Sequence, residues 1–355
     1  MPVRRARSPG PFEDRGKAAM LMVRAARSAD HSAFTALAAS AGTGFTSLAV
    51  TPDALAEKLG VSEASFAGRV TDRSDATYQL MLEDTVSGTV LGTAAVKAGI
   101  GIKKPYFDFK IMTFAQASRE ANRRFDMEAM MLVNDFAGCT EVGSLFVSDA
   151  ARGRGAGRLM AQSRYMLMGA DRTRFGARVV AELRGVVDEH GESVFFNHVT
   201  RPFFRMTFDE ADRMSASTDN QFILDLMPTH PIYLDHLPPG VREVMGKTHP
   251  HGVNAKKLLE WEGFEYHRYV DIFDGGPLVD CAADRIRTLR ESRVLSVGKA
   301  SGERVEAMVS TGRMEDFRLI RCEVQVSGES VALDEGARRL LDLGDGDTAS
   351  VWVNT

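Results

Sequence analysis

The hexapeptide Arg152-Gly-Arg-Gly-Ala-Gly157 lies between two segments with different periodicities. Before it, residues 141–148 are β-prone and are predicted to form a strand. After it, apolar residues recur at helical spacing over residues 155–170, which predicts a helix with one buried face. Glycines allow a backbone to wrap closely around a phosphate, and a following helix points free N–H groups at that anion. We therefore predict a phosphate-binding loop whose binding residues are Arg152, Arg154, Gly155 and Gly157.

The spacing of this loop excludes two common phosphate motifs. A Rossmann loop requires glycine at the position of Arg152, and a Walker loop ends in Gly-Lys followed by Ser or Thr, which this loop does not. The pattern Arg-x-x-Gly-x-Gly instead resembles the loop that holds the pyrophosphate of coenzyme A in acyltransferases of the GNAT class. A structural turn and a different phosphate ligand are the remaining alternatives.

The elements predicted around the loop alternate as in a mixed sheet. Toward the N-terminus, a strand at 21–26 precedes a helix whose apolar residues recur from Phe34 to Ala41. Thr51-Pro52-Asp53 predicts the start of a second helix, because it combines a cap, a proline at the first helical position and an acid in the first turn. Further strands are predicted at 77–83, 89–99, 178–183 and 264–273, with a helix at 254–262. The fold class predicted is α/β (α+β), with helices flanking one sheet.

Three parts are predicted along the chain. Residues 1–20 are rich in arginine, proline and glycine and lack an apolar signal core, so we expect a disordered tail. Residues 21–275 carry the elements of a GNAT-like acyltransferase core. Gly275-Gly276-Pro277 predicts a break, and residues 276–355 contain short β-prone runs that predict a small C-terminal β-barrel.

Composition excludes several classes of function. The net charge is −4 and 26% of the residues are charged, so nothing indicates a nucleic-acid or membrane partner. No apolar run is long enough to span a bilayer. The cysteines Cys139, Cys281 and Cys322 are too widely spaced for a zinc site, so we expect no metal. Free thiols are typical of a reducing compartment, which predicts a cytoplasmic protein.

Several longer stretches resemble one family, the arginine N-succinyltransferases, including the arginine/ornithine succinyltransferase subunits. The resemblance runs from about Met22 to past Arg293, and it is strongest in GTGFTSL (42–48), AELRGVVDEHG (181–191), LMPTHPIY (226–233), GKTHP (246–250) and EGFEYHRYVDIFDGGP (262–277). It implies transfer of succinyl from succinyl-CoA to the α-amino group of L-arginine, in arginine catabolism. It also implies that His249, in GKTHP, is the catalytic proton donor. Leu145, and with it Val147, is expected to contact succinyl-CoA.

Charged residues around the strand at 178–183 are the candidates for acceptor binding. Glu182 is a candidate catalytic residue and, like the acids that follow it, a candidate for binding the guanidinium. The α-amino group must lose a proton before it attacks a thioester, so a base or a water chain is needed, and its identity stays open. A guanidinium prefers carboxylates, which makes Asp188 and Glu189 candidates, and the substrate carboxylates prefer Arg184. Asp188 and Glu189 are equally compatible with a solvated turn. Two further candidates complete this set, namely Asn134, which is also compatible with an Asx turn, and His190, the rival of His249.

No cysteine or serine has the surroundings of a nucleophile, so direct attack without an acyl-enzyme is expected. Three alternatives remain open: ornithine or another amine as acceptor, a CoA-binding regulatory subunit that needs a sister chain, and a protein-modifying acetyltransferase. The expected partners are the two small-molecule substrates and further copies of the chain, or a sister subunit in a hetero-oligomer. The loop at Thr43, Thr46 and Ser47 is expected either to close over the acceptor or to be purely structural.

Overall fold

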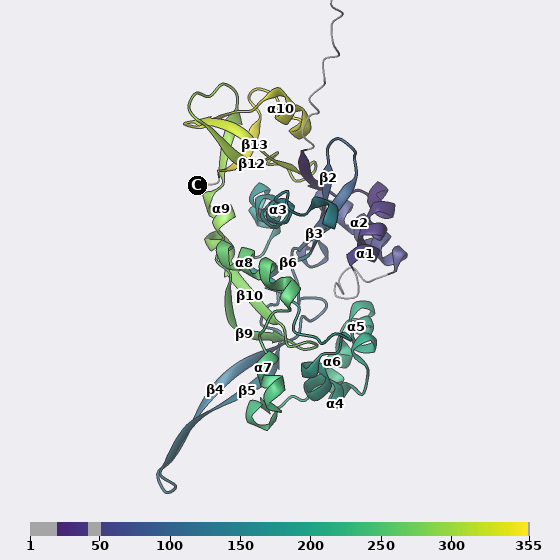
Figure 1. Cartoon of the computed structure of the whole chain (residues 1–355), viewed down its shortest axis with the longest axis vertical. Coiled ribbons are helices and arrows are strands. Elements are labelled where there is room, and N and C mark those ends of the chain that lie inside the picture. The colour runs from purple at the N-terminus through teal and green to yellow at the C-terminus, as the bar shows by residue number, and fades with distance from the viewer. Residues whose placement is uncertain (1–19, 42–50, 354–355) are drawn as a thin grey trace, which may run out of the picture.

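The computed structural model describes residues 20–41 and 51–353 (Figure 1). The predicted disordered tail lies outside the described residues except for Met20, and so does the whole loop 42–48. The described part is elongated, with a barrel at one end, a sheet flanked by helices in the middle, and a helical lobe with a projecting hairpin at the other end.

The central strands confirm the predicted mixed sheet. In spatial order they are β1 (Leu21–Ala25), β2 (Thr77–Asp84), β3 (Val90–Lys97), β6 (Thr140–Val147), β7 (Arg178–Glu182), β10 (Pro277–Ala282) and β9 (Glu265–Asp271). Their neighbours are antiparallel except for β6 and β7, which are parallel. The helix α3 (Ala156–Ala170) connects β6 to β7, as a parallel pair requires.

Helices cover both faces of this sheet. On one face, Leu159 and Met160 of α3 pack with Val179 and Ala181 of β7. On the other face lie α1 (His31–Ala41) and α2 (Pro52–Phe66), whose apolar residues pack against Met81 and Phe146. The predicted start of α2 is confirmed, since the hydroxyl of Thr51 accepts a hydrogen bond of 3.3 Å from the Ala54 N–H. The helix α8 (Val253–Glu262) ends at Gly263, which has a φ of 105°.

The parallel strands β6 and β7 separate soon after they meet. They pair only at Thr140 with Val179 and at Glu141 with Val180, although β6 continues to Val147. The register of β6 against β3 shifts next to Ser144, whose φ is 49°. A bulge bends the strand that carries it. Residues 142–147 therefore have no partner strand on the β7 side among the described residues, which leaves a gap in the middle of the sheet.

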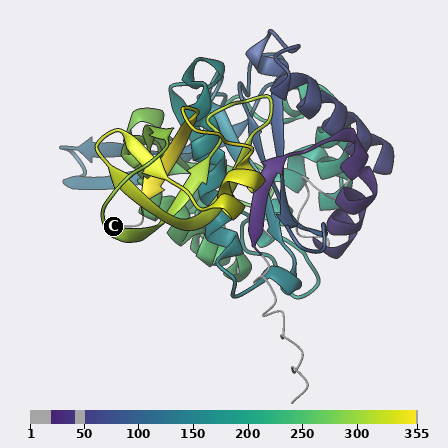
Figure 2. The same ribbon diagram turned by 90° about the horizontal axis from the view of Figure 1, so that it is seen from above.

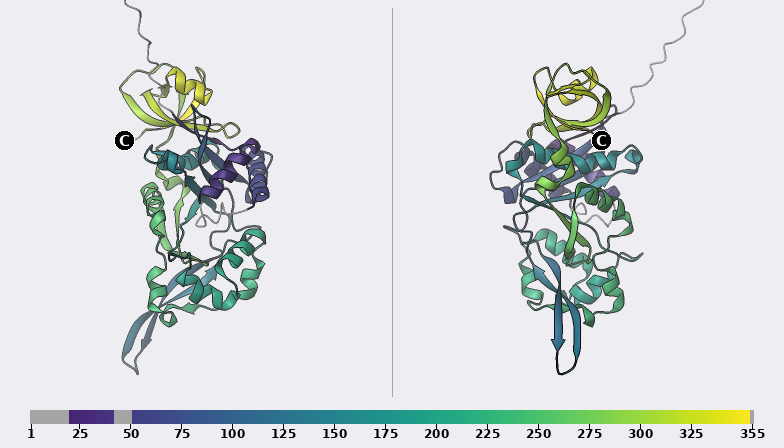
Figure 3. Two further views of the ribbon diagram at one scale, coloured as in Figure 1. Left: turned by 45° about the vertical axis from the view of Figure 1, so that its right-hand side comes forward. Right: turned by 90° about the vertical axis from the view of Figure 1, so that its left-hand side faces the viewer.

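The helical lobe and the projecting hairpin were not predicted from the sequence. The lobe contains a π-helical turn (Phe196–Thr200), α4 (Arg201–Phe204), α5 (Phe208–Ser217), α6 (Gln221–Leu226), a short strand β8 (Ile232–Tyr233) and α7 (Pro239–Val244). Phenylalanines hold it together, with Phe204 in edge contact with Phe222 and Phe273. The hairpin pairs β4 (Asp108–Ser118) with β5 (Arg123–Val133), and its far half extends away from the body (Figure 3).

The predicted C-terminal β-barrel is confirmed. Its five strands in the described residues are β11 (Arg293–Val297), β12 (Arg304–Ser310), β13 (Arg318–Ser327), β14 (Ser330–Ala332) and β15 (Thr348–Val353). The barrel closes because β12 pairs with both β15 and β13, and Figure 2 looks onto it from above. Its core includes Ile320, Val324 and Leu341, the last from α10 (Glu335–Leu341).

The division into domains stays a prediction. The strand β10 follows the predicted boundary at residues 275 and 276 but pairs with β7 and β9 in the central sheet. These pairings favour a boundary near the short helix α9 (Arg287–Glu291), after which the barrel begins. The barrel nevertheless remains attached to the sheet, because β13 also pairs with β1.

Candidate active site

The predicted phosphate loop has the geometry that close approach of an anion requires. Gly153 and Gly155 have φ angles of 77° and 74°, in the left-handed region that favours glycine. The second of them is the N-cap of α3, so the free N–H groups of the first turn begin there. Arg152 is 72% exposed and pairs with Asp149, and Arg154 pairs with Asp84 at 3.1 Å.

The other two predicted donor contacts lie in the stretch of β6 that does not pair with β7. Leu145 and Val147 are half-buried and pack against the core on the α3 side. Gly157, in the first turn of α3, has no atom within 4 Å of the position that a Cβ would take. The unpaired stretch of β6, the phosphate loop and the start of α3 thus follow one another directly along the chain.

Glu182, the last residue of β7, lies at the centre of the second half of the site. Its Oε2 accepts a hydrogen bond of 2.9 Å from the phenol of Tyr106. Alternation along β7 places this carboxylate on the face opposite α3, the face that α1 and α2 cover. The side chain is solvent-accessible, but protein surrounds it on most sides and removes part of its hydration. This burial, together with the negative charges of Glu141 and Asp274, raises the pKa of Glu182 to about 7.

Further acids surround Glu182, and we call Glu141, Asp108, Asp271, Asp274 and Glu182 the acidic cluster. Glu141 forms an ion pair of 2.8 Å with Lys97. Asp108 is only 1% exposed, and its Oδ2 has no hydrogen-bond partner in the described residues. Burial, with Glu182 and Glu141 nearby, holds the pKa of Asp108 well above its usual range. Such a crowded set of carboxylates is costly unless a cation or protons compensate it.

Two members of the acidic cluster also fix the backbone around Glu182. The carboxylate of Asp274 accepts hydrogen bonds from the Gly185 N–H at 2.7 Å and the Gly276 N–H at 2.8 Å. Asp271 accepts from the N–H groups of Phe273 and Asp274. Burial raises the pKa values of both carboxyl groups, which face each other in the turn between β9 and β10. This turn therefore locks the chain that follows β7.

His249 is tied to the same segment. Its backbone N–H donates a 2.8 Å hydrogen bond to the carbonyl oxygen of Arg184, two residues beyond Glu182. Its Nδ1 accepts a 3.2 Å hydrogen bond from the His251 N–H, so the neutral ring carries its proton on Nε2. Burial, with Arg184 and His251 nearby, lowers the pKa of His249, which favours this neutral form.

Other predicted site residues lie apart from this cluster or have structural partners. Asp188 caps its own turn by accepting from the N–H groups of His190 and Glu192, and it is exposed. Glu189 and His190 are also exposed, at 87% and 78%, and pair weakly with each other. Asn134 accepts from the Tyr106 N–H and donates to the Gly101 carbonyl, each at 3.0 Å. It therefore positions the loop that carries Tyr106.

Sequence reasoning missed five members of the site: Tyr106, Asp108, Glu141, Asp271 and Asp274. Tyr106 lies just before the projecting hairpin and Asp108 is the first residue of its strand β4, in a segment that was not predicted. Glu141 and Asp274 carried a usable signal, since Glu141 begins and Asp274 directly follows a segment that was predicted to be a buried strand. Such a signal identifies a polar residue at an unusual position but does not predict which other side chains lie near it.

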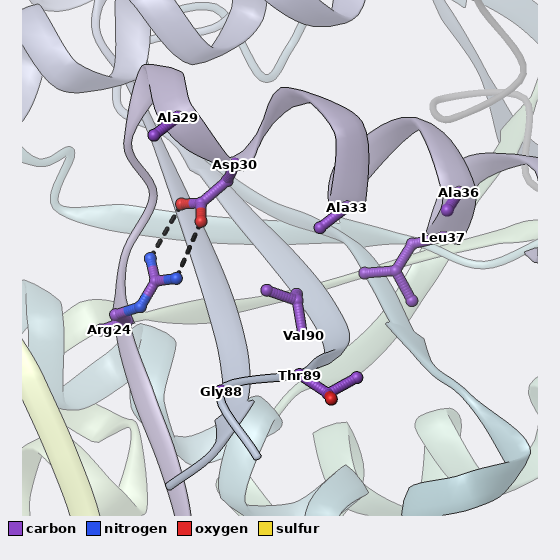
Figure 4. Close-up of a pocket in the computed structure, with 9 residues that line it drawn as sticks. All are labelled: Arg24, Ala29, Asp30, Ala33, Ala36, Leu37, Gly88, Thr89 and Val90. Carbon is purple, nitrogen blue, oxygen red and sulfur yellow. Dashed lines mark hydrogen bonds and ion pairs between the residues drawn. The ribbon is translucent and has the colours of Figure 1, made fainter.

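Two cavities in the described residues lie away from this site. One, of about 430 Å³, is lined by α1, β1 and the β2–β3 turn (Figure 4). The guanidinium of Arg24 in its wall is already paired, because it donates to both carboxylate oxygens of Asp30 and to the carboxylate of Glu83. The other, of about 570 Å³, lies at the barrel, and four of its eight lining residues are valines. In the described residues no group of His, Cys, Asp or Glu is arranged to hold a metal, and no helix could cross a membrane.

Comparison with known proteins covers nearly the whole chain. Residues 21–288 match the family described as arginine N-succinyltransferase beta subunit, and residues 290–352 match the family described as its C-terminal domain. The arginine N-succinyltransferase of Enterobacter sp. (strain 638) is 36% identical over 93% of this chain and 96% of its own length. That of Shigella flexneri is 35% identical over 92% of this chain and 96% of its own length.

A solved structure of a succinyltransferase subunit has a similar fold. The solved structure of arginine/ornithine succinyltransferase subunit AI from Pseudomonas aeruginosa superposes with a TM-score of 0.84 at 32% identity, covering 95% of this chain and 99% of that one. The predicted family, fold class and enzyme class are therefore confirmed. The chain belongs to the arginine N-succinyltransferase family and is an acyltransferase.

Proposed function

We propose that the enzyme transfers the succinyl group of succinyl-CoA to the α-amino group of L-arginine by direct attack. The observation that carries this proposal is the carboxylate of Glu182, which accepts a 2.9 Å hydrogen bond from Tyr106 within the acidic cluster and whose pKa is raised to about 7 by burial and the neighbouring acids. A base with a pKa near the working pH is the most effective proton acceptor. The family match, the phosphate loop and the gap beside β6 support a CoA thioester as donor.

The acidic cluster suits an acceptor that carries two positive charges. L-Arginine brings an α-ammonium and a guanidinium, and a guanidinium binds carboxylates with paired hydrogen bonds. Glu182 takes the α-ammonium proton, and the negative charge that the acidic cluster carries around Glu182 attracts the second cationic group. The phenol of Tyr106 holds Glu182 in place by donating to its Oε2.

The donor is held at its two ends. The N–H groups of Gly155 and Gly157, with the guanidinium groups of Arg152 and Arg154, bind the phosphates. Leu145 and Val147 contact the chain that leads to the thioester. Arg184 lies beyond the end of β7, close enough to Asp274 and His249 to affect their pKa values, and binds the succinyl carboxylate.

The reaction proceeds in two steps without a covalent enzyme intermediate. Glu182 takes a proton from the α-ammonium, and the free amine attacks the thioester carbonyl to form a tetrahedral oxyanion. Collapse of that intermediate breaks the carbon–sulfur bond, and the second proton that the attacking nitrogen loses protonates the neutral ring of His249. The resulting imidazolium donates its Nε2 proton to the departing thiolate and returns to the neutral form. The products are the succinylated amine and free CoA, and Glu182 passes its proton to solvent before the next turnover.

Ornithine is a second candidate acceptor, favoured by the name of the Pseudomonas relative, arginine/ornithine succinyltransferase subunit AI. That name, with the description beta subunit, also favours assembly of this chain with further copies of itself or with a sister subunit. The cysteines Cys139, Cys281 and Cys322 are buried and free, which fits the reducing cytoplasm.

The test is release of CoA by the purified chain from succinyl-CoA with L-arginine or L-ornithine, with acetyl-CoA as the control donor. Turnover that requires both succinyl-CoA and L-arginine is expected, together with N2-succinylarginine in the product by mass spectrometry. Equal turnover with acetyl-CoA would show that the enzyme is not specific for a succinyl donor. No turnover with any pair would favour the subunit that needs a sister chain, and turnover with protein lysines alone would favour a protein acetyltransferase.

A further inference from the structure

A side chain of the C-terminal barrel reaches into the phosphate loop. Ile320 and Cys322 of β13 point into the barrel core, so Arg321 between them points outward, toward the central sheet. Its Nη2 donates a 3.1 Å hydrogen bond to the backbone carbonyl of Arg154, a residue 167 positions earlier in the chain. Its ion pair with Glu306 is long, at 3.8 Å, and solvent-exposed, so the carbonyl is the closer partner.

Glycine at residue 155 lets the guanidinium of Arg321 take this position without shifting. A Cβ at Gly155 would lie 2.7 Å from Nη1 and 2.9 Å from Nη2 of Arg321, closer than atoms of real side chains approach. The absence of a Cβ therefore makes room for the guanidinium at the start of α3, in addition to permitting the φ of 74°.

The hydrogen bond also sets the direction of a neighbouring N–H group. In a trans peptide the C=O and the following N–H point in opposite directions. Because Arg321 binds the Arg154 carbonyl from the barrel side, the N–H of Gly155 points away from the barrel. A flip of this peptide would turn the carbonyl dipole toward the proposed phosphate site and repel the anion.

A second contact holds the barrel at the same helix. The guanidinium of Arg158, one turn into α3, lies 4.6 Å from the ring centre of Trp261 and 5.3 Å from that of Trp352. Trp261 belongs to α8 and Trp352 to β15 of the barrel. The barrel is thus fixed on α3 at two places, and the position of Arg321 relative to the loop does not depend on its own weak ion pair.

We propose that Arg321 is a positioning residue for donor binding, through which the barrel orders the loop that binds the donor's phosphates. The inference rests on the proposed use of a CoA thioester. It assigns the barrel a part in recognising the nucleotide end of the donor, and it predicts that donors without phosphates do not need this residue.

The test compares Arg321→Gln and Arg321→Lys with Arg304→Gln in the full chain. Arg304 is a matched control, because it is a barrel arginine with an equally long 3.8 Å ion pair, to Glu323. Two donors are used, succinyl-CoA and succinyl-pantetheine, which carries the same thioester without phosphates. The KM for each donor, kcat, the Kd of CoA by calorimetry and the Tm are measured.

In Arg321→Gln, the KM for succinyl-CoA and the Kd of CoA should rise about tenfold or more, the effect of a lost charge-assisted hydrogen bond. Arg321→Lys should restore part of this loss. The kcat, the rates with succinyl-pantetheine and all values for Arg304→Gln should stay within about twofold of wild type, the scatter of ordinary surface substitutions.

Unchanged CoA affinity in Arg321→Gln would overturn the inference. Equal losses with both donors, accompanied by a lower Tm, would also overturn it, because they show that Arg321 only holds the barrel in place. If wild type binds CoA but does not acylate arginine, the proposed function fails while the role of Arg321 is still decided by calorimetry.

Discussion

The phenol of Tyr106 donates a 2.9 Å hydrogen bond to Oε2 of Glu182, although 76 residues separate the two in the chain. The bond lowers the pKa of Glu182, whereas burial and the neighbouring acids raise it, and the balance lies at about 7. Tyr106 therefore keeps a crowded carboxylate able to ionise near neutrality, which is the property that a base in amine acylation needs.

Replacement of the proposed base should reduce turnover far more than binding. We expect Glu182→Gln to lower kcat by about 10²- to 10⁴-fold, the usual contribution of a general base. The matched control is Glu189→Gln, because Glu189 is 87% exposed and its contact with His190 is a weak 3.6 Å pair. Steady-state kinetics with succinyl-CoA and L-arginine provide the measurement. A Glu182→Gln enzyme with wild-type kcat would exclude Glu182 as the base.

The pH profile should report the same group. Glu182 acts in its ionised form, so kcat/KM should rise with pH through a midpoint of about 7. In Tyr106→Phe the carboxylate loses a donor that lowers its pKa, so the midpoint should move to higher pH. Tyr233→Phe, at an exposed tyrosine of β8, should leave the profile in place. A midpoint that stays fixed in Tyr106→Phe would show that another group controls the profile.

The two candidate histidines should behave differently. His249→Ala should lower kcat by about 10²-fold or more, since it removes a proton donor. His190→Ala should have almost no effect, because His190 is 78% exposed on a turn that Asp188 holds. Both variants are to be compared at pH 8 after circular dichroism confirms folding. The reverse ranking would transfer the acid role to His190.

Replacing Gly155 or Gly157 of the phosphate loop with alanine should have different effects on stability. Gly155→Ala should lower the Tm and weaken CoA binding, because alanine is strained at a φ of 74° and its Cβ would meet Arg321. Gly157→Ala has open space and should not lower the Tm, yet its methyl group would crowd a phosphate at the helix end and raise the Kd of CoA.

A helical glycine far from the loop provides the control for this pair. Gly60, in α2, has no atom within 4 Å of a new Cβ, so Gly60→Ala should stabilise the fold by about 0.5–1 kcal/mol and leave CoA binding unchanged. Thermal unfolding and calorimetry distinguish these outcomes. Equal CoA affinity in wild type and Gly157→Ala would place the phosphates elsewhere.

Local patterns in the sequence determined much of the fold. The loop between β6 and α3, the cap at Thr51 and the helix end at Gly263 were predictable, because each depends on the conformational preferences of adjacent residues. The barrel was predictable from its short β-prone runs. The role of His249 was predicted only from the resemblance to the arginine N-succinyltransferases. A single histidine in a loop carries no signal of its own.

Tertiary structure alone decided which of these residues meet. The pKa of Glu182 depends on Glu141 of β6 and on Asp274 in the turn between β9 and β10, which are brought together only by the order of the sheet. Tyr106 reaches Glu182 because Asn134 holds its loop, and Arg321 reaches Arg154 because β13 pairs with β1. Burial, charge and hydrogen bonding between distant segments are properties of packing, so no local pattern in the sequence encodes them.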